Sequence, residues 1–239
     1  MILITICARA GSKGIKNKNI QELMGKPLIQ HTIEQAKQWG KASQIVVSTD
    51  SDVIKEISRS LSVSAPFTRP EYLSSDTAGK VDVIKHALKE SEKIFGTTFK
   101  TIIDLDVTAP LRNVSDIENA YQTLQKDALD VVFSVVEAHR NPYFNMVEID
   151  NDKKGVYLCK KLNESVIRRQ DAPKVYSMNA SIYVYDRQFL MDDSNSTIFG
   201  KNTGVYEMPE ESIFDIDRPI DLKLVEFFMK ERLIDASKR

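Results

Sequence analysis

The 239-residue sequence has little of what marks several common classes of protein. It contains two cysteines, Cys7 and Cys159, which lie far apart and belong to no metal-type cluster. It contains three histidines, also far apart, and no serine–histidine–aspartate arrangement stands out. We therefore expect reduced structural thiols, and we expect chemistry other than that of a catalytic triad.

The sequence also lacks an excess of charge and long apolar runs. Its 33 basic and 34 acidic residues give a formal net charge of −1, which argues against broad coating of a nucleic acid. No apolar run approaches the roughly 20 residues of a membrane span. The apolar start, residues 1–7, is too short for the core of a signal peptide and has no basic beginning. We expect a cytoplasmic protein that binds neither nucleic acid nor membrane.

What the sequence does contain is a regular alternation of strand-like and helix-like segments. Strands are expected at 2–7, 45–48, 101–105 and 130–136, and helices at 28–39, 52–60, 81–95 and 115–126. In the last of these helices, Ser115 and Glu118 have the spacing of a capping box. The order predicts an α/β, Rossmann-like fold: a mostly parallel sheet with helices on both faces.

The pattern changes after residue 136. Two strands at 143–149 and 156–160, joined by a turn at 151–155, suggest a hairpin excursion over 139–178. Further segments follow: a strand at 181–185 that resumes the sheet, an edge strand at 205–208 and a terminal helix at 219–233. We expect one domain over 1–239 that carries this excursion. An isolated hairpin is marginal in water, so it must fold back on its own domain or be covered by a second subunit.

The segment after the first strand is rich in glycine and basic residues. Gly11 and Gly14 permit tight turns and close backbone approach, and the segment contains no acid. Ligands of parallel α/β sheets bind beyond the carboxyl ends of strands, where exposed N–H groups can surround an anion. The segment carries four cations: Arg9, Lys13, Lys16 and Lys18. This pattern favours a triphosphate site over a solvated basic loop.

Ala8-Arg-x-x-Ser-Lys-Gly14 followed by Lys18-Asn-Ile20 resembles the signature of the acylneuraminate cytidylyltransferases, the CMP-sialic acid synthetases. The resemblance covers nearly the whole chain and continues in the family's order through Ser48-Thr-Asp50, Arg69-Pro70, Leu73-Ser-Ser-Asp-Thr-Ala78, Thr108-Ala-Pro-Leu-Arg112, Arg169-Gln170, Asn179 with Ser181-Ile-Tyr183, and Asp215-Ile-Asp217. It implies a fold of the nucleotide-diphospho-sugar transferase type. It also implies transfer of CMP from CTP to an acidic nine-carbon sugar, with release of pyrophosphate.

The resemblance assigns roles around the nucleotide. The catalytic residues it implies are Arg9, Lys13, Lys18 and Asp217. The nucleotide-binding residues are Ala8, Arg9, Ala10, Gly11, Ser12, Lys13, Lys18, Arg69, Asp76 and Ala78. An arginine can donate hydrogen bonds to O2 and N3 of cytosine. Uracil presents a different pattern of donors and acceptors, so an arginine at this position can distinguish the two bases. Ser74 and Asp76 are equally suited to forming the turn before the next helix.

Two late carboxylates, Asp215 and Asp217, alternate along the chain and share one face of an extended backbone. Such a pair suits Mg²⁺, which binds one or two carboxylates together with substrate phosphates. Taken without the resemblance, Asp217 suits a helix cap before Pro219 equally well. The resemblance implies that both aspartates hold the catalytic metal, Mg²⁺ or alternatively Mn²⁺.

The chain departs from the sialic acid synthetases near the sugar. Asp106 stands where they carry glutamine, and it can read the sugar, bind a second metal or cap a loop. Arg112 can pair with the sugar carboxylate or with Asp106. Phe144 stands near a family lysine and suits a more apolar sugar tail, or ordinary hairpin core. The runs 104–108, 140–145 and 199–204 are closer to the CMP-legionaminic acid synthetase branch.

The sugar-binding residues suggested in this way are Asp106, Arg112, Phe144, Arg169, Gln170 and Asn179. In the family the excursion docks onto a second subunit and lends residues to its sugar pocket, so a homodimer is expected. Three rival functions remain open: a CMP-Kdo synthetase or other sugar nucleotidyltransferase, a glycosyltransferase that uses Asp104 and Asp106 for its metal, and a nucleotide-binding protein without catalysis.

Overall fold

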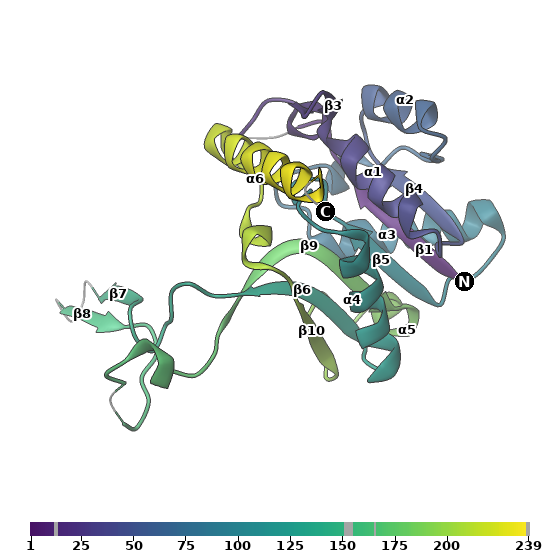
Figure 1. Ribbon diagram of the computed structural model, residues 1–239. Coiled ribbons are helices and arrows are strands. Elements are labelled where there is room, and N and C mark those ends of the chain that lie inside the picture. The colour runs from purple at the N-terminus through teal and green to yellow at the C-terminus, as the bar shows by residue number, and fades with distance from the viewer. Residues whose placement is uncertain (12–13, 151–154, 165, 238–239) are drawn as a thin grey trace.

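A six-stranded twisted sheet forms the centre of the protein (Figure 1). The computed structural model describes residues 1–11, 14–150, 155–164 and 166–237. The strand order is β10-β6-β9-β5-β1-β4. The strands are β1 (Ile2–Cys7), β4 (Gln44–Ser48), β5 (Thr101–Leu105), β6 (Val131–Glu137), β9 (Tyr176–Asp186) and β10 (Thr203–Glu207). β1 runs parallel to β4 and β5, β10 runs parallel to β6, and β9 runs antiparallel to β5 and β6.

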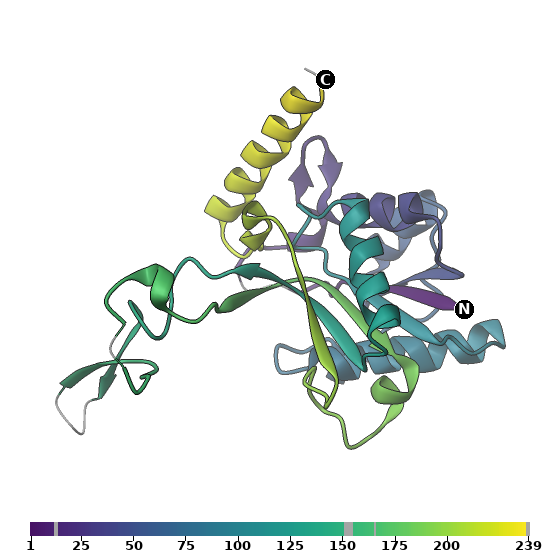
Figure 2. The same cartoon turned by 60° about the horizontal axis from the view of Figure 1, so that its bottom comes forward.

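Helices pack on both faces of this sheet, as Figures 1 and 2 show, so the predicted α/β, mostly parallel fold is confirmed. The alternation of side chains along β1 shows why the strand is apolar throughout. Leu3 belongs to a core cluster beneath α3, and Ile4 and Ile6 belong to the cluster beneath α1 and α4. The helices are α1 (Leu28–Trp39), α2 (Asp52–Ser60), α3 (Lys80–Phe95), α4 (Val114–Lys126), α5 (Arg187–Met191) and α6 (Pro219–Ser237).

Several short elements connect these parts. Two short strands form a small ribbon: β2 (Glu22–Leu23) and β3 (Lys26–Pro27). Four single 3₁₀ turns are η1 (Lys18–Ile20), η2 (Glu71–Leu73), η3 (Arg169–Asp171) and η4 (Glu210–Ile213). Among the described residues, no helix is both long enough and apolar enough to span a bilayer.

The start of α4 corrects a sequence-based expectation. Asn113, not Ser115, is the N-cap, and Asp116 completes the capping box by accepting from the Asn113 backbone N–H at 2.6 Å. Glu118 instead accepts a hydrogen bond from the indole N–H of Trp39 at 2.8 Å. The serine and the glutamate fitted the spacing of the motif two residues too late, because an equally good pair, Asn113 and Asp116, stood just before them.

The excursion projects from the sheet as an arm (Figures 1 and 2). Its hairpin is β7 (Val147–Asp150) and β8 (Gly155–Leu158), both shorter than predicted. The predicted turn at 151–155 lies outside the described residues except for Gly155. β9 starts at Tyr176, so the sheet resumes earlier than the predicted end of the excursion at 178. In the arm Ile149 is 74% exposed and Val156 is 64% exposed, so these apolar side chains have no cover within the described chain.

Candidate active site

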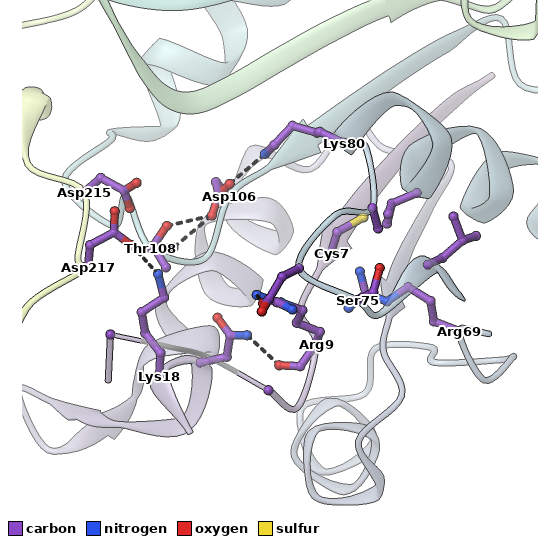
Figure 3. Close-up of a pocket in the computed structure, with 17 residues that line it drawn as sticks. Cys7, Arg9, Lys18, Arg69, Ser75, Lys80, Asp106, Thr108, Asp215 and Asp217 are labelled. Atoms are coloured by element: carbon purple, nitrogen blue, oxygen red, sulfur yellow. Dashed lines mark hydrogen bonds and ion pairs between the residues drawn. The ribbon is translucent and has the colours of Figure 1, made fainter. Parts of the chain in front are cut away.

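A cavity of about 510 Å³ opens beyond the carboxyl ends of β1 and β5 (Figure 3). This is the edge at which ligands of parallel α/β sheets bind. It lies between the segment after β1, the loops before α3 and after β5, and the segment before α6. Its lining is Cys7, Arg9, Gly11, Gly14, Lys18, Asn19, Arg69, Leu73, Ser75, Asp76, Ala78, Lys80, Val83, Asp106, Thr108, Asp215 and Asp217.

One end of the cavity contains an arginine prepared to donate hydrogen bonds. Arg69 is 5% exposed, and its Nε and Nη2 atoms have no hydrogen-bond partner among the described residues. A buried unpaired donor costs free energy, so this geometry indicates a ligand that accepts from Arg69. Leu73 and Val83 supply apolar surface beside it. The site suits a flat, polar-edged group such as a nucleobase.

Arg9 ties the segment after β1 to the loop before α3. Its guanidinium lies 2.5 Å from Asp76 Oδ1 and donates to the carbonyl of Ser74 at 3.3 Å. Ala10 donates its backbone N–H to Asp50 Oδ1 at 2.7 Å. Ala8 is buried and continues the pairing of β1 through the Ser48 carbonyl at 3.0 Å. Of the predicted nucleotide-binding residues, Ala8 and Ala10 are therefore backbone supports, whereas Arg9, Gly11, Arg69, Asp76 and Ala78 line the cavity.

The same segment touches the end of the chain at Gly14. A Cβ atom on Gly14 would overlap the carbonyl oxygen of Asp217, so only glycine permits this approach. Lys18 Nζ lies 2.7 Å from Asp217 Oδ1 in the same region. The predicted convergence of the basic segment with the two late aspartates is thus present (Figure 3). The predicted ligands Ser12 and Lys13 lie outside the described residues.

Asp215 and Asp217 form an acidic end of the cavity. Asp215 Oδ1 is buried and has no hydrogen-bond partner among the described residues. Burial raises the pKa of Asp215, and the neighbouring carboxylates of Asp106 and Asp217 raise it further. The carboxylate of Asp217 is 67% exposed, and it does not cap α6. Asp221 performs that task, since its carboxylate accepts from the backbone N–H groups of Asp217 and Arg218.

This arrangement fits a hard divalent cation. The unpartnered oxygen of Asp215 and the exposed carboxylate of Asp217 are two oxygen donors at one edge of a polar cavity. Within the described residues there is no group of three metal-ligating side chains. Two carboxylates completed by water and substrate phosphate are the usual donor set of Mg²⁺ and unlike a closed structural metal site.

Lys80 is a cavity residue that sequence reasoning missed. Its Nζ atom lies 2.6 Å from Asp106 Oδ2 and 3.4 Å from Asp104 Oδ2. Thr108 donates to the other oxygen of Asp106 from its backbone N–H and its hydroxyl. Burial alone would raise the pKa of Asp106, but Lys80 and Thr108 outweigh burial and lower it to about 2. The available sequence signal was a lysine at the first position of a helix, where acidic residues are favoured.

Arg112 lies behind the loop after β5 rather than in the lining of the cavity. This side chain is 2% exposed and is not among the described residues that line the cavity. Its guanidinium donates to the side chains of Gln35 and Thr32 and to the backbone carbonyls of Ser181 and Asp106. All its donor groups are engaged by the protein, so Arg112 supports the loop after β5, and its pairing with a sugar carboxylate stays a prediction. It meets Asp106 through the backbone and not through an ion pair.

Asn179 is likewise structural. It is 2% exposed, accepts from the Ser134 hydroxyl at 2.6 Å, and donates to the carbonyl of Ser212 at 3.1 Å. These bonds connect β9 to β6 and to η4, and Asn179 is not among the described residues that line the cavity. The sugar contact expected from the resemblance therefore stays a prediction.

Three further predicted sugar residues lie on the arm. Phe144 sits in the turn that Asn141 organises by accepting from the Phe144 backbone N–H at 3.0 Å. Arg169 and Gln170 line a separate cavity of about 350 Å³ at the base of the arm. None of the three is among the described residues lining the cavity of Figure 3. One copy of the described chain therefore does not bring them to Asp106.

Comparisons with known proteins agree with this geometry. A family model described as "Cytidylyltransferase" matches residues 3–239. The chain is 44% identical over 235 residues to "Post-translational flagellin modification protein B" of Campylobacter coli, covering 98% of this chain and 97% of that protein. It is 44% identical over 228 residues to "CMP-N,N'-diacetyllegionaminic acid synthase" of Campylobacter jejuni, covering 95% and 94%.

More distant relatives show the same pattern. The chain is 32% identical over 214 residues to "N-acylneuraminate cytidylyltransferase" of Streptococcus agalactiae, covering 89% of this chain and 49% of that protein. Among solved structures, a CMP:2-keto-3-deoxy-manno-octonic acid synthetase complexed with CTP matches with a TM-score of 0.70 at 20% identity, covering 97% of this chain and 99% of the other. At that identity the match is one of fold.

Proposed function

Because this chain belongs to the cytidylyltransferase family and is a nucleotidyltransferase, we propose that it transfers CMP from CTP to the anomeric hydroxyl of a nonulosonic acid and releases pyrophosphate. Legionaminic acid or a derivative is the favoured acceptor, since one relative at 44% identity carries that substrate in its name. The observation that carries the proposal is that Arg9 and Lys18 meet Asp215 and Asp217 around one cavity.

CTP lies along the cavity in this proposal. Its base occupies the end at Arg69, whose unpaired Nε and Nη2 donors match the O2 and N3 acceptors of cytosine. Its triphosphate lies along the segment after β1, where Arg9 and Lys18 supply positive charge. Lys13 and Ser12, proposed from the sequence, extend that segment. Uracil would leave a donor of the site unpaired, which disfavours UTP.

Asp215 and Asp217 would hold Mg²⁺, or Mn²⁺ in its place. Such a cation, when bound, lowers the pKa of a coordinated hydroxyl and offsets phosphate charge. The chain's own part is to place the two carboxylates: η4 and the start of α6 fix the segment, and Asp221 binds the backbone N–H of Asp217.

The transfer itself needs no covalent intermediate on the protein. The anomeric hydroxyl of the sugar gives its proton to water, and its oxygen attacks the α-phosphorus in line. The bond between that phosphorus and the oxygen bridging to the β-phosphorus breaks, and pyrophosphate leaves with the electron pair. Arg9 and Lys18 neutralise the charge that grows on the leaving group. Lys18 Nζ lies 2.7 Å from Asp217 Oδ1, so a bound triphosphate would compete with this carboxylate for the ammonium group. Positioning and charge stabilisation supply the rate.

The acceptor side is completed by a second subunit in this proposal. Arg169, Gln170 and Phe144 lie on the arm, away from the cavity of their own chain. The arm exposes apolar side chains that a partner would cover, including Ile149 and Val156. A homodimer in which each arm reaches the other subunit satisfies both observations. The whole of 1–239 is then one cytidylyltransferase domain with an arm for dimerisation.

Two alternatives to this proposal are a different reaction and a different acceptor. A glycosyltransferase that binds metal through Asp104 and Asp106 conflicts with the structure, because Lys80 Nζ already contacts both carboxylates. N-acetylneuraminic acid is the second candidate acceptor, since the streptococcal relative at 32% identity is named for acylneuraminate.

Pyrophosphate release tests the proposal. Purified protein is incubated with CTP and Mg²⁺ and, in parallel, legionaminic, N-acetylneuraminic, pseudaminic and Kdo acids. We expect release with the nonulosonic acids, fastest with a legionaminic acid, and little with UTP. Equal rates with and without every sugar, or preference for Kdo, would reject the proposed acceptor class. Sedimentation of the same sample tests the dimer separately.

A further inference from the structure

Lys80 occupies a position that helix electrostatics disfavour. It is the first residue of α3, directly after the N-cap Gly79, where the helix presents partial positive charge. An ammonium group there is unfavourable unless carboxylates offset it. Two carboxylates do so, from β5 and the loop that follows it: Asp104, which is 1% exposed, and Asp106, which is 22% exposed at its side chain.

The contacts of Lys80 fix its orientation. Nζ binds Asp106 Oδ2 at 2.6 Å and Asp104 Oδ2 at 3.4 Å, and it lies 4.6 Å from the centre of the Tyr183 ring. Asp104 also accepts from the Thr5 hydroxyl at 2.8 Å, so it belongs to the buried sheet. Asp106 faces the cavity (Figure 3). Lys80 therefore links a buried, fixed carboxylate to one that a ligand can reach.

Charge excludes two simpler roles for this lysine. One ammonium and two carboxylates leave a net charge of −1, which repels a phosphate or the carboxylate of an acidic sugar. Lys18, by contrast, is paired with one exposed carboxylate and can exchange it for phosphate. An ionised Asp106 is an acceptor only, so its natural ligand is a donor: a hydroxyl or an acylamido N–H.

We propose that Lys80 is the positioning residue for acceptor recognition: it holds Asp106 ionised and oriented so that Asp106 accepts a hydrogen bond from a hydroxyl or acylamido N–H of the sugar. The inference rests on the proposed function and assigns a residue outside the sequence motifs of the chain. The proposal assigns Lys80 and Asp106 to the acceptor and assigns Arg69 and Arg9 to the nucleotide. All four residues line the same cavity.

The test compares four variants in the pyrophosphate assay: Lys80→Met, Lys80→Arg, Asp106→Asn and the double variant with Met and Asn. We expect Lys80→Met and Asp106→Asn each to raise the KM for the sugar about 10- to 100-fold, the loss of one charge-assisted hydrogen bond. The KM for CTP stays within about twofold, as do the CTP affinities measured by calorimetry without sugar. The double variant is no worse than the worse single variant, because both changes remove one interaction. Lys80→Arg restores part of the loss.

Lys85→Met is the matched control. Lys85 lies on the same helix, is 12% exposed at its side chain, and pairs with Asp193 away from the cavity. It should leave both KM values unchanged. Since Lys80→Met leaves Asp104 with a buried uncompensated charge, thermal unfolding is recorded for every variant; Asp106→Asn and Lys80→Arg keep the test valid if that variant fails to fold.

The outcomes separate the two proposals. An unchanged sugar KM in folded Asp106→Asn or folded Lys80→Met, or an equal rise in the KM for CTP, overturns the role of Lys80 while the proposed function stands. Absence of pyrophosphate release by the unaltered protein with every acidic sugar overturns the proposed function, and the role of Lys80 with it.

Discussion

Lys18 and Asp217 are 199 positions apart in the sequence, yet Lys18 Nζ lies 2.7 Å from Asp217 Oδ1. Beside this contact, Gly14 packs against the Asp217 backbone. The contact brings the basic segment after β1 to the carboxylates before α6 and closes the cavity that both line. This pair of residues therefore joins the positive charge and the carboxylates that the proposed triphosphate and cation sites require.

Asp217→Ala should abolish turnover without unfolding the protein. The carboxylate is 67% exposed and does not cap α6, so its loss removes only a partly exposed ion pair with Lys18, which contributes little to stability. We expect turnover with CTP and Mg²⁺ to fall by several orders of magnitude and the melting temperature to stay within about 2 °C. Asp221→Ala is the comparison: it removes the carboxylate that binds two backbone N–H groups, so it should destabilise by about 1 kcal/mol. Near-normal turnover of Asp217→Ala would remove Asp217 from the mechanism.

Gly14→Ala should lower both stability and activity. Its Cβ atom would overlap the Asp217 carbonyl oxygen, so the segment after β1 must shift away from the acidic end. We expect a lower melting temperature and a drop in kcat/KM. Gly11→Ala provides the control for stability, because nothing lies within 4 Å of its Cβ position. Equal melting temperatures for the two variants would show that the close approach at Gly14 does not contribute to the stability of the fold.

Arg69→Met should weaken CTP binding without lowering the stability of the protein measured without CTP. In the free protein two buried donors of Arg69 are unpaired, and each such group costs about 1–3 kcal/mol. We expect the melting temperature without ligand to remain equal or rise, and the stabilisation by CTP with Mg²⁺ to be largely lost. Arg59→Met, at a side chain 72% exposed on α2, should keep the full stabilisation by CTP. A lower melting temperature together with an intact CTP response would contradict base recognition by Arg69.

Asp106→Asn should alter the pH dependence of stability in one direction. The pKa of Asp106 in the folded protein is lowered to about 2, whereas the pKa of an aspartate in an unfolded chain is about 3.9. The native state favours the ionised form, so the carboxylate stabilises the fold above the unfolded pKa and loses this effect as pH falls toward about 2. In urea unfolding, the free energy of unfolding of the unaltered protein should therefore exceed that of the variant by a constant margin from pH 7 to pH 5.

Below about pH 4 this difference in the free energy of unfolding should narrow, because protonation of Asp106 removes the same negative charge that the substitution removes. Asp52→Asn, at an exposed surface pair with Lys55, should show almost no margin at any pH. A margin for Asp106→Asn that grows as the pH falls would reverse the sign and contradict the ion pair with Lys80.

Much of the fold was predictable because it depends on local patterns. The strand Ile2–Cys7 and the helix Leu28–Trp39 have the bounds expected from periodicity, since burial on both faces or on one stripe leaves a regular record in the sequence. The hairpin was placed correctly, but its strands were predicted too long. Exposed strands such as β7 lack the core contacts that make a period visible.

The cavity was predictable only in part. Motifs placed Arg9, Lys18, Arg69, Asp215 and Asp217 at one site, and the structure brings these five side chains to the same cavity. The same kind of motif also placed Arg112 and Asn179 there, although each is 2% exposed and fully engaged within the protein. A sequence motif records that a residue lies near a site, but it does not record which way the side chain points.

By itself, the sequence determined the order of strands and helices along the chain, the location of the basic segment after β1 that we propose binds phosphate, and the pair of carboxylates before α6. These follow from apolar period, glycine placement and charge along a short stretch of chain. The tertiary structure alone decided that Lys80 pairs with Asp104 and Asp106, that Arg112 is a buried support, and that the arm lies away from its own cavity. These depend on contacts between segments far apart in the chain, whose distances are set by how the sheet and helices pack and leave no local trace.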